Sequence, residues 1–199
     1  MQIRAERYTA HMNQIAETTT ETENTVESFD ELDLSPAMRR ALKKAEFSTP
    51  SPIQSQLIPL AMEGEDVIGQ ARTGTGKTAA FAIPILEQLD SLEDCRDPQA
   101  IIVVPTRELV LQVVEQIEQL SKYINTRVLG VYGGTNINTQ RQAILQGQDI
   151  IVATPGRLYD LVLSNSLKMK SIQKLVIDEV DVMLDLGFRF QLMNIFDVI

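Results

Sequence analysis

The chain has 199 residues, of which 44% are hydrophobic and 23% charged, and this composition predicts one domain with a sizeable buried core. Its 27 acidic and 18 basic residues give a net charge of −9, which argues against an extended nucleic-acid-binding surface. Eight acids and two bases fall within the first 35 residues, however, so the rest of the chain holds 19 acids and 16 bases. A local basic site is compatible with that nearly neutral remainder.

One cysteine, Cys95, and one histidine, His11, are too few for a disulfide framework or a zinc cluster. The apolar runs are all shorter than the roughly 18 residues that cross a membrane, and residues 1–16 contain no apolar segment typical of a signal peptide. We therefore expect no membrane association and a cytoplasmic location.

The N-terminal segment, residues 1–27, is polar, rich in Thr and Glu, and without periodic apolar positions. It is predicted to be a disordered acidic tail, and the folded domain is expected over residues 28–199. Ser35 followed by Pro36 predicts the start of a helix over residues 36–45. A proline-rich break over residues 47–52 separates it from a second short helix over residues 53–62.

From residue 66 onward, strand-like and helix-like segments alternate. The expected strands are 66–70, 100–104, 127–132, 149–152 and 173–177, and the expected helices are 77–90, 107–122, 136–146, 156–163, 180–185 and one from about 189. This alternation predicts an α/β fold, a doubly wound and mostly parallel sheet with helices on both faces. In such folds the ligand site lies at the carboxyl ends of the strands.

Residues 71–78 have the pattern of a phosphate-binding loop, between the expected strand 66–70 and the expected helix 77–90. Glycine leaves backbone N–H groups open to a phosphate, and the helix N-terminus adds unsatisfied donors and positive potential. Lys77 is expected to contact the β- and γ-phosphates and Thr78 to bind Mg²⁺. The general pattern begins with glycine where this chain has Ala71, so the loop alone does not decide the function.

The expected strand 173–177 ends in two carboxylates, Asp178 and Glu179. This position suits a nucleotide-hydrolysing site, in which Asp178 holds Mg²⁺ directly or through water and Glu179 orients and deprotonates the attacking water. The alternative is an ordinary acidic helix N-terminus, because Asp and Glu are favoured there by the helix dipole. A phosphate loop in the same chain favours the catalytic interpretation.

Six motifs occur in order along the chain, at Phe29 with 47–54, then at 71–78, 105–109, 133–134, 154–157 and 178–181, and together they make the chain resemble the DEAD-box RNA helicases. Residues 178–181 resemble the helicase signature, and residues 47–54 resemble the glutamine motif, with Phe29 as the isolated upstream aromatic. Residues 105–109, 133–134 and 154–157 resemble the RNA-contacting elements of the first lobe. The resemblance implies a RecA-like P-loop NTPase lobe with ATP and Mg²⁺ as cofactors and RNA as the partner.

Site residues follow from these motifs. Lys77, Asp178 and Glu179 are the expected catalytic residues, with Thr78 and Asp178 as metal ligands. The expected nucleotide-binding set is Phe29, Phe47, Gln54, Ala71, Arg72, Thr73, Gly74, Thr75, Gly76, Lys77, Thr78 and Asp181. The expected RNA-binding set is Pro105, Thr106, Arg107, Gly133, Gly134, Thr154, Pro155, Gly156 and Arg157.

Two recognition rules accompany these sets. The side-chain amide of Gln54 can donate and accept at once, as the adenine edge requires, so it is expected to select ATP over GTP while Phe29 stacks on the base. The RNA set suits sugar-phosphate contacts that are indifferent to base sequence, with 2′-hydroxyl contacts favouring RNA. Alternatively, Gln54 is a polar turn residue, residues 133–134 form a plain turn, and Arg157 is a surface helix residue.

The chain departs from the family pattern in three places. Val180 stands where the signature has alanine, and Glu46 stands where the glutamine motif begins with glycine, so the turn there lacks glycine's freedom or differs in shape. The chain also ends at Ile199, before the serine-alanine-threonine segment and the second lobe that the resemblance implies. We therefore expect a fragment, with a gap in the sheet between the phosphate-loop strand and the strand 173–177.

The predicted function is the first lobe of an ATP-dependent RNA helicase, which hydrolyses ATP and unwinds short duplexes only together with the second lobe. A phosphate-loop kinase or another NTPase would leave the glutamine motif and residues 105–109 without a purpose. A non-catalytic ATP-dependent RNA clamp or scaffold would have little use for the water-activating Glu179. The RNA, the protein partners and the oligomeric state are not identified by the sequence.

Overall fold

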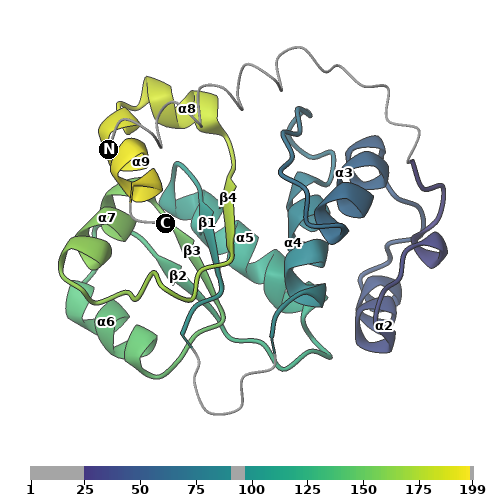
Figure 1. Cartoon of the computed structure of the whole chain (residues 1–199), viewed down its shortest axis with the longest axis horizontal. Coiled ribbons are helices and arrows are strands. Elements are labelled where there is room, and N and C mark those ends of the chain that lie inside the picture. The colour runs from purple at the N-terminus through teal and green to yellow at the C-terminus, as the bar shows by residue number, and fades with distance from the viewer. Residues whose placement is uncertain (1–24, 91–96, 198–199) are drawn as a thin grey trace.

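A computed structural model of the chain describes residues 25–90 and 97–197. Within them lies a four-stranded, all-parallel sheet in the order β2-β3-β1-β4 (Figure 1). The strands are β1 (Ala100–Val103), β2 (Val128–Val131), β3 (Ile150–Ala153) and β4 (Lys174–Ile177). Ala100 is opposite Ile150 on one side and Lys174 on the other, which puts the carboxyl ends of the strands at one edge of the sheet.

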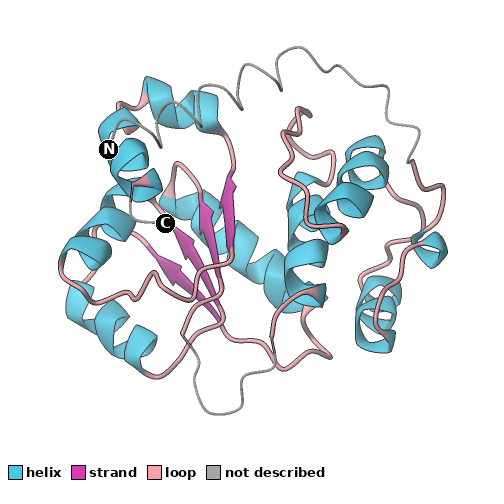
Figure 2. Cartoon of the chain, in the orientation of Figure 1, coloured by secondary structure: helices cyan, strands magenta, loops and turns pink. Residues whose placement is uncertain are grey.

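Helices cover both faces of this sheet (Figure 2). In chain order they are η1 (Phe29–Glu31), α2 (Pro36–Lys44), α3 (Pro52–Met62), α4 (Lys77–Glu87), α5 (Arg107–Leu120), α6 (Ile137–Leu145), α7 (Pro155–Leu163), α8 (Val180–Asp185) and α9 (Arg189–Phe196). The predicted doubly wound α/β class is therefore confirmed, and every predicted helix is present with bounds within three residues of those expected.

Two apolar cores, one on each face, follow from the alternation of side chains along the strands. Ile102 of β1 packs into the core that includes residues of α2, α4 and α5. Its neighbours Ile101 and Val103 pack into the core that includes residues of α7, α8 and α9. Because β1 and β3 are buried on both faces, they consist of continuous apolar residues, as expected for interior parallel strands.

The prediction of a strand over residues 66–70 is wrong, because this segment between α3 and α4 pairs with no strand of the described residues. Val67 and Ile68 are 36% and 67% exposed, so neither is packed as a sheet residue would be. A strand forms only where a neighbouring strand satisfies its backbone groups. Here β4 is the last strand of the sheet, and the segment lies on its far side from β1 (Figure 1).

Some sequence predictions concern residues that the structure does not describe. The predicted acidic tail lies outside the described residues as far as residue 24, and so do Cys95 and His11. Val26 is described, and its N–H donates to the Ser55 carbonyl at 3.2 Å. In the described parts of the chain, no helix is both long and apolar enough to cross a membrane.

Candidate functional site

The phosphate-loop residues lead into the N-terminus of α4. Gly74 and Gly76 have φ angles of 81° and 87°, in the left-handed region that glycine tolerates best. Gly76 is the N-cap of α4 and offers no side chain to the first N–H groups of the helix. A Cβ at Gly76 would collide with the Gln54 side chain, whereas one at Gly74 would meet nothing within 4 Å. Gly76 is therefore required both by its φ angle and by the close contact with Gln54. At Gly74 only the φ angle favours glycine, because the space around it is empty.

Lys77 meets the carboxyl end of β4. Its Nζ lies 3.6 Å from Asp178 Oδ1, and the two side chains are 24% and 15% exposed. The Asp178 N–H donates to the Val103 carbonyl at 3.0 Å, which continues the sheet pairing past the end of β4. Two motifs separated by 101 positions in the sequence thus meet at one edge of the sheet.

Glu179 begins the turn into α8. It is the N-cap of that helix with a left-handed φ of 55°, and its N–H donates to Asp178 Oδ1 at 3.0 Å. Asp181, which belongs to the predicted nucleotide-binding set, is exposed on α8. No group of three or more Asp, Glu, His or Cys residues that could hold a metal occurs in the described residues. Proteins commonly bind Mg²⁺ through one or two carboxylates together with substrate phosphates and water.

The loop in front of Lys77 is closed by its own hydrogen bond, from Thr75 Oγ1 to the Arg72 carbonyl at 2.7 Å. Arg72 and Thr73 are exposed, and Ala71 is half-buried. Thr78 follows Lys77 as the second residue of α4, in the first turn of that helix.

Gln54 is a buried part of the loop's support. Its side chain is 3% exposed, Oε1 accepts from the Ser51 N–H at 2.9 Å, and Nε2 donates to the Gly76 carbonyl at 3.1 Å. An amide has two donor hydrogens and two acceptor lone pairs. One donor and one acceptor position therefore remain after these two bonds.

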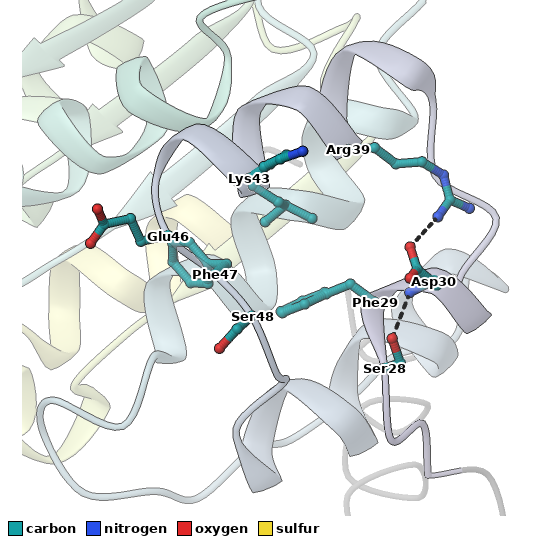
Figure 3. A pocket seen from close by; sticks show the side chains of 9 residues that line it. Ser28, Phe29, Asp30, Arg39, Lys43, Glu46, Phe47 and Ser48 are labelled. Atoms are coloured by element: carbon teal, nitrogen blue, oxygen red, sulfur yellow. Dashed lines mark hydrogen bonds and ion pairs between the residues drawn. The ribbon is translucent and has the colours of Figure 1, made fainter.

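The two predicted aromatics, Phe29 and Phe47, contact each other edge to face with ring centroids 6.2 Å apart. Both line a cavity of about 550 Å³ together with Arg39 and Lys43 of α2 (Figure 3). Gln54 is not among the residues that line it. The structure thus pairs the two rings and places the amide beside the phosphate loop.

The predicted RNA-binding residues follow the carboxyl ends of β1, β2 and β3. Thr106 caps α5, because its hydroxyl accepts from the Leu109 N–H at 3.2 Å. The next residue, Arg107, holds its guanidinium 4.8 Å from the ring centre of Tyr132, which follows β2. Pro105 leads from β1 into this cap and is buried. The start of α5 and the loop after β2 are therefore in direct contact.

Beyond Tyr132, residues 133 and 134 form a turn in which an added Cβ on either glycine would meet nothing within 4 Å. Arg157 of α7 reaches this turn, since Nη2 donates to the Thr135 carbonyl at 3.0 Å and Nη1 to Gln140 Oε1 at 2.6 Å. Pro155 and Gly156 begin α7, and Thr154 is its N-cap without using its hydroxyl for capping. The structure therefore joins the glycine turn to the start of α7.

Tyr132, Thr135 and Gln140 take part in this region but were not singled out from the sequence. Gln140 lies on the same helical face as Ile137 and Ile144, the face that packs inward. A polar residue within an apolar face is a usable signal of a buried polar contact. No comparable pattern in the sequence indicates that the Tyr132 ring contacts the Arg107 guanidinium.

Comparison with known proteins agrees with the motifs. The family model described as DEAD/DEAH box helicase matches residues 51–199. The DEAD-box ATP-dependent RNA helicase CshA of Streptococcus pneumoniae is 48% identical over 160 residues, covering 80% of this chain and 30% of that protein. The ATP-dependent RNA helicase CshA of Limosilactobacillus reuteri is 47% identical over 160 residues, or 80% of this chain and 32% of that protein.

Among solved structures, a DEAD box protein from the hyperthermophile Methanococcus jannaschii superposes with a TM-score of 0.83 at 38% identity. The alignment covers 87% of this chain and 47% of that one. The alignments thus cover less than half the length of each of these three proteins.

Proposed function

Because this chain belongs to the DEAD/DEAH box helicase family, we propose that it is the ATP- and RNA-binding first lobe of an ATP-dependent RNA helicase. Hydrolysis of ATP and the unwinding of short RNA duplexes would need a second lobe. The observation that carries the proposal is the 3.6 Å approach of Lys77 Nζ to Asp178 Oδ1. It brings the phosphate loop to the carboxylates of β4, as a nucleotide-hydrolysing site requires.

At the phosphate end, ATP would lie against the open backbone of Gly74 and the uncapped N-terminus of α4. Lys77 supplies a positive charge to the terminal phosphates, and the loop N–H groups orient them. Thr78 and Asp178 would hold Mg²⁺, which neutralises phosphate charge when bound. Glu179, next to Asp178, would orient the attacking water and take its proton.

At the base end, Gln54 retains one donor and one acceptor position, which matches the amino group and ring nitrogen of adenine. Gln54 Nε2 also donates to the Gly76 carbonyl, so the residue assigned to base recognition contacts the phosphate loop directly. The Phe47 and Phe29 rings would supply the apolar contact for the base.

RNA would cross the carboxyl ends of β1, β2 and β3. Arg107 and Arg157 supply positive charge, while the Gly133–Gly134 turn and the start of α7 offer backbone N–H groups to phosphates. The predicted RNA-binding set consists of Thr, Arg, Gly and Pro residues, whose hydroxyl, guanidinium and backbone groups suit sugar-phosphate contacts, and this supports binding that is indifferent to base sequence. The cytoplasmic location expected from the sequence stays a prediction.

The first test is the binding of fluorescent ATP and GTP to the chain. ATP is expected to bind in preference to GTP, and Lys77→Ala to weaken ATP binding by about 10- to 100-fold, because a charged hydrogen-bonding partner is lost. Gln54→Ala is expected to reduce the preference for ATP over GTP. Lys170→Ala and Gln56→Ala, which change exposed residues of the same types, should bind as the parent does. Equal affinity for ATP and GTP in the parent chain would contradict the adenine assignment.

The catalytic-lobe and non-catalytic-clamp hypotheses predict different effects for a substitution of Glu179. In a protein that carries both lobes, Glu179→Gln is expected to lower RNA-stimulated ATP turnover by about 10² to 10⁴ while ATP still binds, because the base is lost and the volume is kept. The exposed Asp185→Asn is the control for a removed negative charge on the same helix. Turnover that survives Glu179→Gln would exclude the assigned role, and a parent protein that binds both ligands without turnover would indicate a clamp.

A further inference from the structure

Gln140 connects the segments that the proposed function assigns to RNA. Its side chain is buried on α6, with the residue 8% exposed. Nε2 donates to the Tyr132 carbonyl at 3.2 Å and to the Thr135 hydroxyl at 2.9 Å, and Oε1 accepts from Arg157 Nη1 at 2.6 Å. One amide thus bonds to residues that follow β2 and to a residue of α7.

The bonds of Gln140 surround the Gly133–Gly134 turn. Tyr132 precedes the two glycines and Thr135 follows them, and the Thr135 hydroxyl itself donates to the Tyr132 carbonyl at 3.2 Å. Arg157 Nη2 closes the ring of contacts at the Thr135 carbonyl. Both ends of the turn are therefore held, while the glycines between them have open space where side chains would be.

This arrangement matters because two adjacent glycines are intrinsically the most flexible backbone a chain can have. If the turn were mobile in the unbound chain, RNA binding would have to order it. The conformational entropy lost in that step would lower the affinity for RNA. A guanidinium whose direction is fixed by a buried amide also loses less freedom on meeting a phosphate.

We propose that Gln140 is a positioning residue for the RNA backbone, which holds the Gly133–Gly134 turn and the Arg157 guanidinium in one preorganised arrangement. The inference rests on the proposed function and adds to it a residue that contacts no RNA itself. A purely structural role, in which Gln140 only satisfies buried groups under α6, predicts instead that its loss weakens the whole lobe.

The test is a titration of the chain with a single-stranded oligouridylate, followed by fluorescence anisotropy, beside the binding of fluorescent ATP to the same samples. The variants are Gln140→Ala, Arg157→Ala and the double variant. Gln142→Ala is the matched control, because Gln142 is exposed on the same helix. The readout is the ratio of RNA affinity to ATP affinity, because a general loss of folding lowers both.

Gln140→Ala is expected to lower this ratio about tenfold, and Gln142→Ala to leave both affinities unchanged. The double variant should bind RNA no more weakly than Arg157→Ala, because the two residues act as one unit. Thr135→Val, which removes the bridging hydroxyl at nearly constant volume, should lower the ratio by a smaller factor of about three.

Three outcomes would overturn the inference. They are an unchanged ratio in Gln140→Ala and Thr135→Val, a parallel loss of RNA and ATP binding in both, and a double variant whose loss is the product of the single losses. In each of these the parent chain binds RNA, and the proposed function stands. A parent chain that binds ATP but not the oligouridylate would overturn the RNA part of the proposed function, and this inference with it.

Discussion

Glu46, Asn165 and Glu179 are the non-glycine residues of the described chain with positive φ angles. Glu46, at 61°, follows the end of α2, and the N–H of the next residue, Phe47, donates back to the Leu42 carbonyl at 3.0 Å. This is the left-handed position after a helix where glycine is favoured. The turn therefore keeps the shape that glycine would take, although a residue with a Cβ occupies it.

The first prediction at this scale is that Glu46→Gly stabilises the chain. The left-handed conformation costs a residue with a Cβ roughly 1–2 kcal/mol, and part of the gain is lost to the freedom of glycine in the unfolded state. We expect the free energy of unfolding in urea to rise by about 1 kcal/mol. Glu46→Ala removes the same carboxylate but keeps the Cβ, so it should give no comparable gain; an equal gain from both variants would show that charge, not backbone strain, is responsible.

Glu179 has nearly the same φ, 55°, at the carboxyl end of β4. Strain of this kind persists where the surrounding structure demands it, and it is frequent at functional sites. Glu179→Gly is therefore expected to stabilise the chain by about 0.5–1 kcal/mol in urea while removing the proposed base. A loss of stability would mean that the carboxylate makes a favourable contact that outweighs the backbone strain.

At the scale of elements, α2 and α4 are joined by one carboxylate. Glu87, the last residue of α4, accepts from the Ser35 N–H at 2.6 Å through Oε2 and from the Ser35 hydroxyl at 2.7 Å through Oε1. The same Ser35 hydroxyl oxygen accepts from the Met38 N–H at 3.1 Å. The cap of one helix is thus attached to the end of another that lies 52 positions away in the sequence.

Removing this link should loosen α2. Glu87→Ala is expected to lower the free energy of unfolding by about 2 kcal/mol, because two hydrogen bonds to a charged acceptor are lost at a partly buried position. Glu118→Ala, on the exposed face of α5, is the control and should change stability by less than about 0.5 kcal/mol. Urea denaturation measures both, and an equal effect of the two variants would show that the link contributes nothing.

The elements that sequence reasoning located correctly are those with local signals. Ser35 marks a helix start through its capping hydroxyl, and the apolar run at 100–104 predicts an interior strand. Residues 66–70 carry the same apolar signal but form no strand, because a strand depends on a neighbour that local sequence does not specify.

The contacts of the candidate site also fall into those that the sequence could predict and those that it could not. The approach of Lys77 to Asp178 was predictable, because both residues belong to motifs whose chemistry requires them to meet. The contact of Gln140 with Arg157 was not, because it joins single residues of two helices and depends on the side-chain direction of each. Recognition of adenine through Phe29 and Gln54 stays a prediction, because Gln54 bonds to Ser51 and Gly76 and does not line the cavity beside Phe29.

At the scale of the whole molecule, the sheet is protected unevenly. All four residues of β1 and of β3 have no exposed surface, and each of these strands has a neighbour on both sides. Among the described residues, the outer strands β2 and β4 each pair with one strand; all four residues of β4 and three of the four residues of β2 are partly buried. Local opening should therefore cost least at the β4 side of the sheet and most at its centre.

Hydrogen exchange measures this gradient directly, since an amide exchanges when its local structure opens. We expect the amides of β1 and β3 to exchange slowest, those of β4 faster, and those of residues 67–70 fastest, because this segment pairs with no described strand and leaves Ile68 67% exposed. The amides of β2 are the internal reference for an outer strand. Protection of residues 67–70 equal to that of β2 would contradict the expected gradient across the sheet. Exchange as expected would mean that this segment has the apolar, β-branched sequence of a strand but lacks a neighbouring strand to pair with.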